Sequence, residues 1–181
     1  MFERSFIETH LDSVNWWSLE TCQTKYAPRE EPHDLRAAFL NLFSPDPALR
    51  KAGHGKLENN IVVQGYLYPA SREIMSVLCA AIRPSPMQAT AEALDLLFEL
   101  AAGHEETGDI AALCLEEILS IKSHLVAIAD QNQDETARLA IDILAFHSAE
   151  VSSLREFVRR EFESGKLVAY EARLREDGVL A

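Results

Sequence analysis

A chain of 181 residues, with 48% hydrophobic and 25% charged residues, has the composition of a globular protein that can bury its own core. It contains no run of about 18 apolar residues, and its N-terminus lacks the basic and apolar segments of a secretion signal, so we expect a cytoplasmic protein and no membrane partner. Three cysteines without a CxxC spacing argue against a disulfide framework and against a zinc site.

The net charge of −12 lies mainly in the middle of the chain. Residues 61–150 hold 14 acidic and 4 basic side chains, whereas residues 1–60 hold 9 and 7, and residues 151–181 hold 6 of each. Because phosphate backbones attract Lys and Arg, this distribution argues against nucleic acid as a partner. Two interpretations remain: acidic helix faces that keep the chain soluble, and a surface that attracts a basic protein.

The first 33 residues are the least regular part of the sequence. A short helix is expected over residues 11–21, followed by a linker that contains Pro28 and Pro32. The pair Trp16-Trp17 is interpreted as a cap on the exposed end of a helical array, and the alternative is an aromatic platform for a ligand.

From Asp34 onward the spacing of apolar residues predicts helices alone. Ser44-Pro45 and Ser85-Pro86 combine an N-cap residue with a proline at the first helical position, and both are predicted helix starts. Val-rich alternation is absent, so we expect no sheet. The predicted helices cover residues 34–43, 45–60, 69–82, 87–102, 109–129, 135–147 and 150–164, with a short last helix within 166–177.

Three of these helices repeat one local pattern, a small residue followed four positions later by Leu. The pairs are Gly53–Leu57, Ala93–Leu97 and Ala140–Leu144, and their small residues lie 40 and 47 positions apart. That spacing is within the range of HEAT and armadillo repeats, in which each unit is a pair of antiparallel helices.

We therefore predict an all-α fold, a HEAT-like α-solenoid of about three helical hairpins with helical end caps. A single domain would consist of an N-terminal cap and linker over residues 1–33, repeats over 34–165, and a C-terminal cap over 166–181.

The segment from Asn59 to Ser71 resembles a recurring junction in bacterial HEAT-like repeat proteins. Gln64-Gly65 stands at the turn between two helices, and Tyr68-Pro69-Ala70 opens the next helix. Val63 stands where those proteins commonly have a His. The resemblance implies an interaction scaffold, and some small proteins of this kind lie beside secreted toxins as their immunity partners.

Motifs that carry catalytic chemistry are absent from the sequence. Its six histidines form no HExxH pair, and no phosphate-binding loop or nucleophile motif occurs. Carboxylates that are neighbours in sequence point about 100° apart on a helix, so they make no shared acid–base site, although carboxylates from different helices can still converge. We therefore expect a protein that is not an enzyme, without catalytic residues, cofactor or metal.

The leading hypothesis is a non-enzymatic protein that binds a protein partner through acidic side chains around aromatic anchors. In its sharper form it is an immunity protein that occludes a basic toxin or effector. Two alternatives stay open: a small adaptor or self-assembling scaffold, and a hydrolase with converging carboxylates of raised pKa. The sequence leaves the partner and the oligomeric state undetermined. The candidate partner contacts are Tyr66, Tyr68, Glu105, Glu106, Asp109, Glu116 and Glu117.

Overall fold

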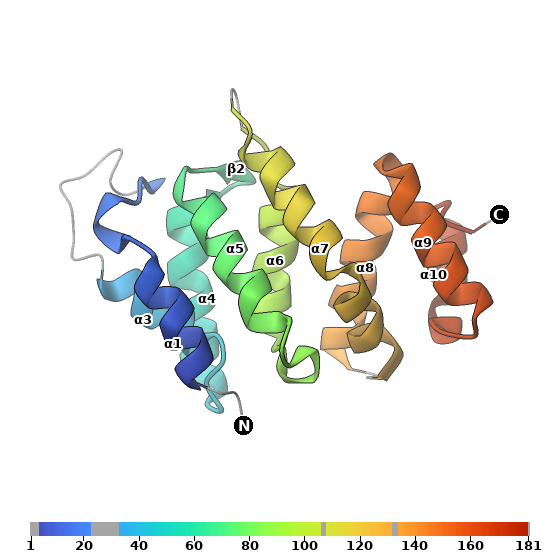
Figure 1. Cartoon of the computed structure of the whole chain (residues 1–181), viewed down its shortest axis with the longest axis horizontal. Helices are drawn as coiled ribbons and strands as arrows, with labels where there is room; N and C mark the ends of the chain where they lie inside the picture. Colours follow the sequence, from blue (N-terminus) through green and yellow to red (C-terminus); the bar gives the residue numbers. More distant parts are fainter. Residues whose placement is uncertain (1–3, 23–32, 106–107, 132–133, 181) are drawn as a thin grey trace.

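In a computed structural model of the chain, the residues that the structure describes are 4–22, 33–105, 108–131 and 134–180. All the long elements in these ranges are helices, so the predicted all-α class is confirmed (Figure 1). None of these helices has the length and apolar character needed to span a bilayer. The elements in chain order are α1 (Arg4–Ser13), the 3₁₀ turn η1 (Trp16–Ser18), α3 (His33–Asn41), α4 (Pro47–Ile61), β1 (Val62–Val63), β2 (Tyr66–Leu67), α5 (Ala70–Ile82), η2 (Pro86–Gln88), α6 (Ala91–Ala102), α7 (Ile110–Gln131), α8 (Glu135–Glu150), α9 (Ser152–Glu163), η3 (Val168–Tyr170) and α10 (Glu171–Glu176).

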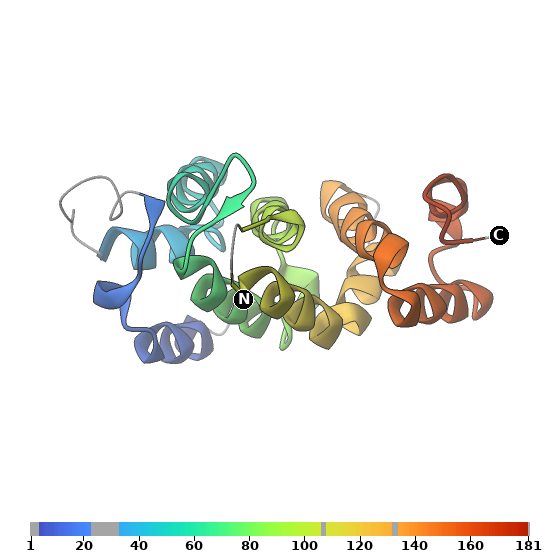
Figure 2. The same cartoon turned by 90° about the horizontal axis from the view of Figure 1, so that it is seen from above.

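The helices lie in two rows, which the view from above separates (Figure 2). In the first row α5 packs between α1 and α7, and α7 also contacts α9. In the second row α6 packs between α4 and α8. The rows contact each other where consecutive helices meet, as in the pairs α5–α6 and α7–α8. One continuous apolar core runs between them, from Leu11 to Val179.

The repeated pairs of a small residue and Leu fall on three consecutive helices of the second row. The small residues Gly53, Ala93 and Ala140 lie on α4, α6 and α8 and are all buried, as are the leucines four positions later. A Cβ atom at Gly53 would lie 2.4 Å from the carbonyl oxygen of Ala38. The small residue therefore lets α3 pack closely on α4.

Two predicted helix starts are displaced in the structure. Helix α4 begins with Asp46 as N-cap, whose carboxylate accepts the N–H of Ala48 at 2.9 Å, and with Pro47 as the first residue. The Ser85-Pro86 pair starts only the short turn η2. Helix α6 begins later because Thr90 caps it, and the Thr90 hydroxyl also donates to the carbonyl of Leu42 at 2.7 Å.

The N-terminal helix also lies earlier than predicted. Helix α1 ends at Ser13, and the chain then turns through η1 instead of forming a helix over residues 11–21. Trp16 folds back, is 8% exposed, and donates its indole N–H to the carbonyl of Leu11 at 2.8 Å. Trp16 is thus part of the core, and the side chain of Trp17 and the linker 23–32 lie outside the described residues.

The junction between α4 and α5 is a short antiparallel ribbon, which corrects the prediction of no sheet. Strands β1 and β2 pair Val62 with Leu67 and Val63 with Tyr66. Both turn residues, Gln64 and Gly65, have positive φ of 54° and 78°, as a type I′ turn requires. The turn therefore lies at Gln64-Gly65, where the sequence places it.

The chain after α6 pairs with this ribbon. The N–H of Leu67 donates to the carbonyl of His104 at 2.8 Å, and the N–H of His104 donates to the carbonyl of Gly65 at 2.8 Å. A Cβ atom at Gly103 would lie 2.5 Å from Leu67 Cδ2, so a small residue is needed where α6 ends. The ribbon thereby holds the start of α5 and the end of α6 together.

Candidate functional site

The two predicted tyrosine contacts lie on the ribbon. The ring of Tyr66 meets the ring of Tyr68 edge to face, with centroids 5.3 Å apart, and meets the imidazole of His104 at 6.1 Å. Tyr68 is buried and Tyr66 is half-buried. Tyr66 is therefore the one of the two tyrosines that presents more of its ring to solvent.

Glu105 comes directly after His104 in the chain, and its contacts are structural. Its carboxylate accepts the N–H of Ala111 at 3.0 Å, in the first turn of α7, where a helix has unpaired N–H groups. Gly108 lies against the same carboxylate with φ of 141°. Asp109 is exposed beside it, and Glu106 lies outside the described residues. The partly buried Glu105 is thus a helix cap.

The other two predicted carboxylates lie about 10 Å further along α7, as the rise of an α-helix places them. Glu117 pairs with Arg83 at 3.0 Å, and Arg83 also donates to the hydroxyl of Ser120 at 2.7 Å. Glu116 is exposed. These residues line a shallow groove of about 340 Å³ between α5 and α7, to which Arg72 also contributes. The predicted contacts therefore form two groups, one at the ribbon and one on α7.

A second charged cluster, which was not named from the sequence, lies between α4 and α6. His54 and Glu58 are one helical turn apart on α4, and Asp95 and Glu99 are one turn apart on α6. Because α4 packs against α6, the two pairs face each other. His54 Nε2 lies 3.3 Å from Asp95 Oδ2 and 3.9 Å from Glu99 Oε2, and His54 Nδ1 lies 3.8 Å from Glu58 Oε2.

The position of this cluster shifts the proton affinities of its members. Burial and the neighbouring Glu58 carboxylate raise the pKa of Glu99 to about 7. The Asp95 carboxylate beside the imidazole raises the pKa of His54, against the opposing effect of partial burial. The His54 imidazole thus lies beside three carboxylates, and their negative charges favour its protonated form.

Few cations balance these carboxylates. The cluster borders a groove of about 240 Å³ whose lining also includes Lys51 and Arg138. Among the described residues, Arg138 pairs with Glu135 at 3.3 Å, and no ion pair joins it or Lys51 to the cluster. Arg50 pairs with Glu92 at 2.8 Å, one turn before Asp95. His54 is therefore the only described cation within ion-pair distance of these three carboxylates.

An aromatic pair bridges α6 and α8 on the same row. The rings of Phe98 and Phe146 meet edge to face with centroids 5.6 Å apart, and Phe146 is 48% exposed. Asp142 and Glu150 lie one turn before and one turn after Phe146 on α8, and Asp95 lies one turn before Phe98 on α6. We call Asp95, Phe98, Asp142, Phe146 and Glu150 the α6–α8 face. It presents an aromatic centre with acidic surroundings.

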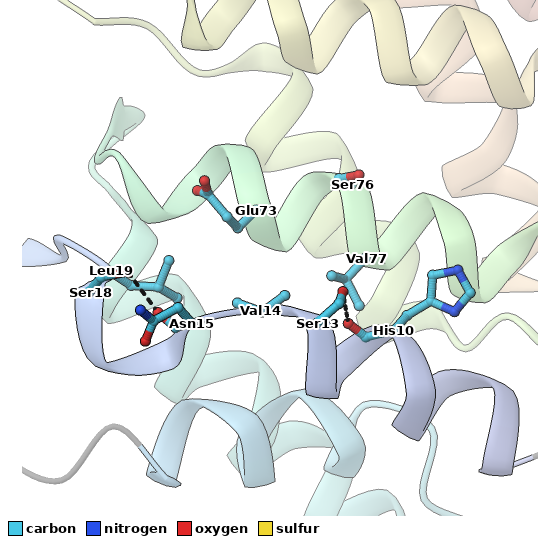
Figure 3. A pocket seen from close by; sticks show the side chains of 9 residues that line it. All are labelled: His10, Ser13, Val14, Asn15, Ser18, Leu19, Glu73, Ser76 and Val77. Atoms are coloured by element: carbon cyan, nitrogen blue, oxygen red, sulfur yellow. Dashed lines mark hydrogen bonds between the residues drawn. The ribbon is translucent and has the colours of Figure 1, made fainter.

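A further groove separates the N-terminal segment from α5 (Figure 3). It has a volume of about 360 Å³, and His10 and Glu73 lie at its opposite ends. The Ser13 and Ser18 hydroxyls donate to the local carbonyls of His10 and Asn15. These groups do not converge, so the groove carries no arrangement for nucleophilic catalysis.

Comparison of the chain with protein-family models, with curated proteins and with solved structures found no match.

Proposed function

We propose that this chain is a HEAT-like repeat protein that binds another protein and catalyses no reaction of its own. The repeat interpretation is supported by the two helical rows and by the recurrence of the buried small residue and Leu on α4, α6 and α8. Repeats stacked in this way give each helix contacts mainly to its neighbours and leave a long continuous surface for a partner.

The observation that carries the proposal is the half-exposed ring of Phe146 on the α6–α8 face. Large aromatic side chains are enriched among the residues that dominate binding energy, particularly where less important contacts surround them. Phe98 holds the Phe146 ring edge to face, so part of its conformational freedom is already lost before a partner arrives. This face combines acidic groups with an aromatic anchor, on residues other than the candidate contacts named from the sequence.

Charge indicates the chemistry of the partner. Helix α6 carries Glu92, Asp95 and Glu99 and no basic residue. Asp142 on α8 forms an ion pair with Arg173 of α10 at 3.4 Å, whereas Glu150 is exposed. We infer a basic protein as the partner, because opposite charge accelerates encounter and disfavours acidic competitors. Inhibition of a basic toxin or effector by an immunity protein is the sharper form of this proposal.

Affinity capture at low and at high salt tests the proposal with charge-reversed variants. We expect wild-type protein to retain a basic protein at low salt and to release it at high salt, and Glu150→Lys to reduce the amount retained. Glu116→Lys, which reverses a predicted contact on α7 in the other row, is the matched control and should retain as much as wild type. Equal retention by wild type and Glu150→Lys would contradict the proposed face.

Self-assembly is the alternative that the same face permits, since an exposed aromatic residue can also bind a second copy. Sedimentation of the wild-type chain over a range of protein and salt concentrations separates the two. We expect a monomer under all conditions. Association that persists in high salt and disappears in Phe146→Ala would replace the proposed partner by a second copy of this chain.

The hydrolase alternative required converging carboxylates with raised pKa, and Glu99 is such a carboxyl group. Glu99 also belongs, with His54 and Asp95, to a set of metal-ligand type, and we therefore interpret the His54 cluster first as a candidate cation site.

A further inference from the structure

Three side chains between α4 and α6 bring ligand atoms of two kinds, an imidazole nitrogen and carboxylate oxygens, close together. One atom each from His54, Asp95 and Glu99 lies within 4.8 Å of the other two. The bonds from Zn²⁺ to imidazole nitrogen and carboxylate oxygen are about 2.0–2.2 Å, so two ligands of one ion lie at most about 4.3 Å apart. The distances of 3.3 Å and 3.9 Å from His54 Nε2 already satisfy this limit.

The innermost atoms of the cluster make ion pairs but, among the described residues, no hydrogen bond of acceptable geometry. His54 Nε2 and Glu99 Oε2 are closed to solvent and make no hydrogen bond of acceptable geometry in the described part of the chain. A buried polar atom without a hydrogen bond is costly, and in native proteins it calls for an explanation. Because both atoms lie within 4.8 Å of a ligand atom of Asp95, one cation bound among the three side chains would satisfy them together.

Glu58 completes a second feature of metal sites. Metal-bound imidazoles almost always donate their other ring N–H to a carboxylate, a carbonyl or water, which fixes the ring and raises its basicity. Glu58 Oε2 lies 3.8 Å from His54 Nδ1, on the side of the ring opposite Asp95 and Glu99. The Glu58 side chain is half-exposed, and its present distance to the imidazole is that of an ion pair rather than of a hydrogen bond.

We propose that His54, Asp95 and Glu99 bind one divalent transition-metal cation, of which Zn²⁺ is the representative, with Glu58 as the positioning residue for the imidazole. One nitrogen and two oxygen donors favour such an ion over Mg²⁺, which prefers oxygen ligands and keeps its water. The Asp95 side chain is half-exposed, so it can reorient to bind the ion. This inference departs from the absence of a metal expected from the sequence, and it does not depend on the proposed protein partner.

Calorimetric titration of the full chain with ZnCl₂ tests the proposal, with metal analysis after dialysis as a second measurement. We expect one Zn²⁺ per chain and much weaker binding of Mg²⁺. His54→Gln and Glu99→Gln should each lower the affinity at least tenfold, and Glu58→Gln about tenfold. His124→Gln changes a histidine on α7, outside the cluster, and should bind as wild type does.

Circular dichroism and the melting temperature first establish that each variant is folded, and Glu99→Gln alone decides the matter if His54→Gln is not. Added Zn²⁺ should raise the melting temperature of wild type and His124→Gln but not that of Glu99→Gln. Titration with Co²⁺ should give visible absorption bands that Glu99→Gln changes. Wild-type affinity in Glu99→Gln or in a folded His54→Gln, or no stoichiometric binding to wild type, would overturn the proposal.

Discussion

At the scale of single residues, the two glycines of α4 have different roles although they lie two positions apart. A Cβ atom at Gly53 would collide with α3, whereas one at Gly55 would meet nothing within 4 Å. Both are poor helix formers, and the sequence does not separate a close helix approach from a weak point. The difference depends on which side of α4 faces α3, which is a property of the packed structure.

We predict opposite effects of alanine at these two positions. Gly53→Ala should lower the free energy of unfolding by about 1–3 kcal/mol, because the backbone of α3 has to move. Gly55→Ala should raise it by about 0.5–1 kcal/mol, since alanine restricts the unfolded chain and favours the helix. Urea unfolding of the two variants beside wild type measures both changes. The same sign for both would contradict the packing described here.

His147 gives the core a dependence on pH. Burial lowers its pKa below the ordinary value of 6.5, and the nearby Glu150 only partly opposes this shift. A histidine with a lowered pKa in the folded state stabilises that state at pH above 6.5, and this contribution is lost as the pH falls through the folded-state pKa. Protonation therefore favours unfolding.

The corresponding prediction compares wild type with His147→Gln, whose side chain does not titrate. Acidification from neutral to mildly acidic pH should reduce the free energy of unfolding more in wild type than in the variant. Denaturant midpoints at a series of pH values give this difference. Parallel curves for the two proteins would show that His147 titrates equally in the folded and unfolded states.

At the scale of elements, the sequence predicts which segments are helices better than it predicts where they begin. The apolar stripes of α5, α7 and α8 were recognised because their spacing is regular over several turns. The start of α6 was placed too early, because Ser85-Pro86 and Thr90 are both plausible starts and only the tertiary bond from Thr90 to Leu42 distinguishes them. The ribbon was missed because its strands are two residues long.

We predict that Thr90, and not Ser85, stabilises the start of α6. Thr90→Ala removes the cap on the N–H of Ala93 and the bond to Leu42, and it should cost about 1 kcal/mol or more. Ser85→Ala should be nearly neutral, because its side chain caps no N–H group. Thermal or urea unfolding of the two variants decides this, and a larger loss for Ser85→Ala would reverse the assignment.

In the whole molecule, the His54 cluster and the α6–α8 face could not be predicted from the sequence, and the reason is the same for both. The sequence does contain pairs of residues one helical turn apart: His54 with Glu58, Asp95 with Glu99, and Asp142 with Phe146. Which of these pairs lie side by side depends on the position of α6 between α4 and α8, in a row that omits α5 and α7. The acidic excess of residues 61–150 was interpreted either as helix faces that keep the chain soluble or as a surface for a basic protein, and α6 is where it meets an exposed aromatic ring.

The arrangement in rows also explains how one surface can include both features. Helix α6 contributes to the His54 cluster through Asp95 and Glu99 and to the α6–α8 face through Asp95 and Phe98, so Asp95 belongs to both. A metal ion at the first and a partner at the second would thus lie on neighbouring faces of one helix.

Binding at the α6–α8 face is tested by the affinity of the captured partner for two variants that each shorten one exposed apolar side chain. Phe146→Ala alters the α6–α8 face, and Val168→Ala alters a residue of η3 that is even more exposed, at 57% against 48%. We predict that Phe146→Ala weakens binding about tenfold or more and that Val168→Ala leaves the affinity within about twofold of wild type. Equal affinities of wild type and Phe146→Ala would contradict the account.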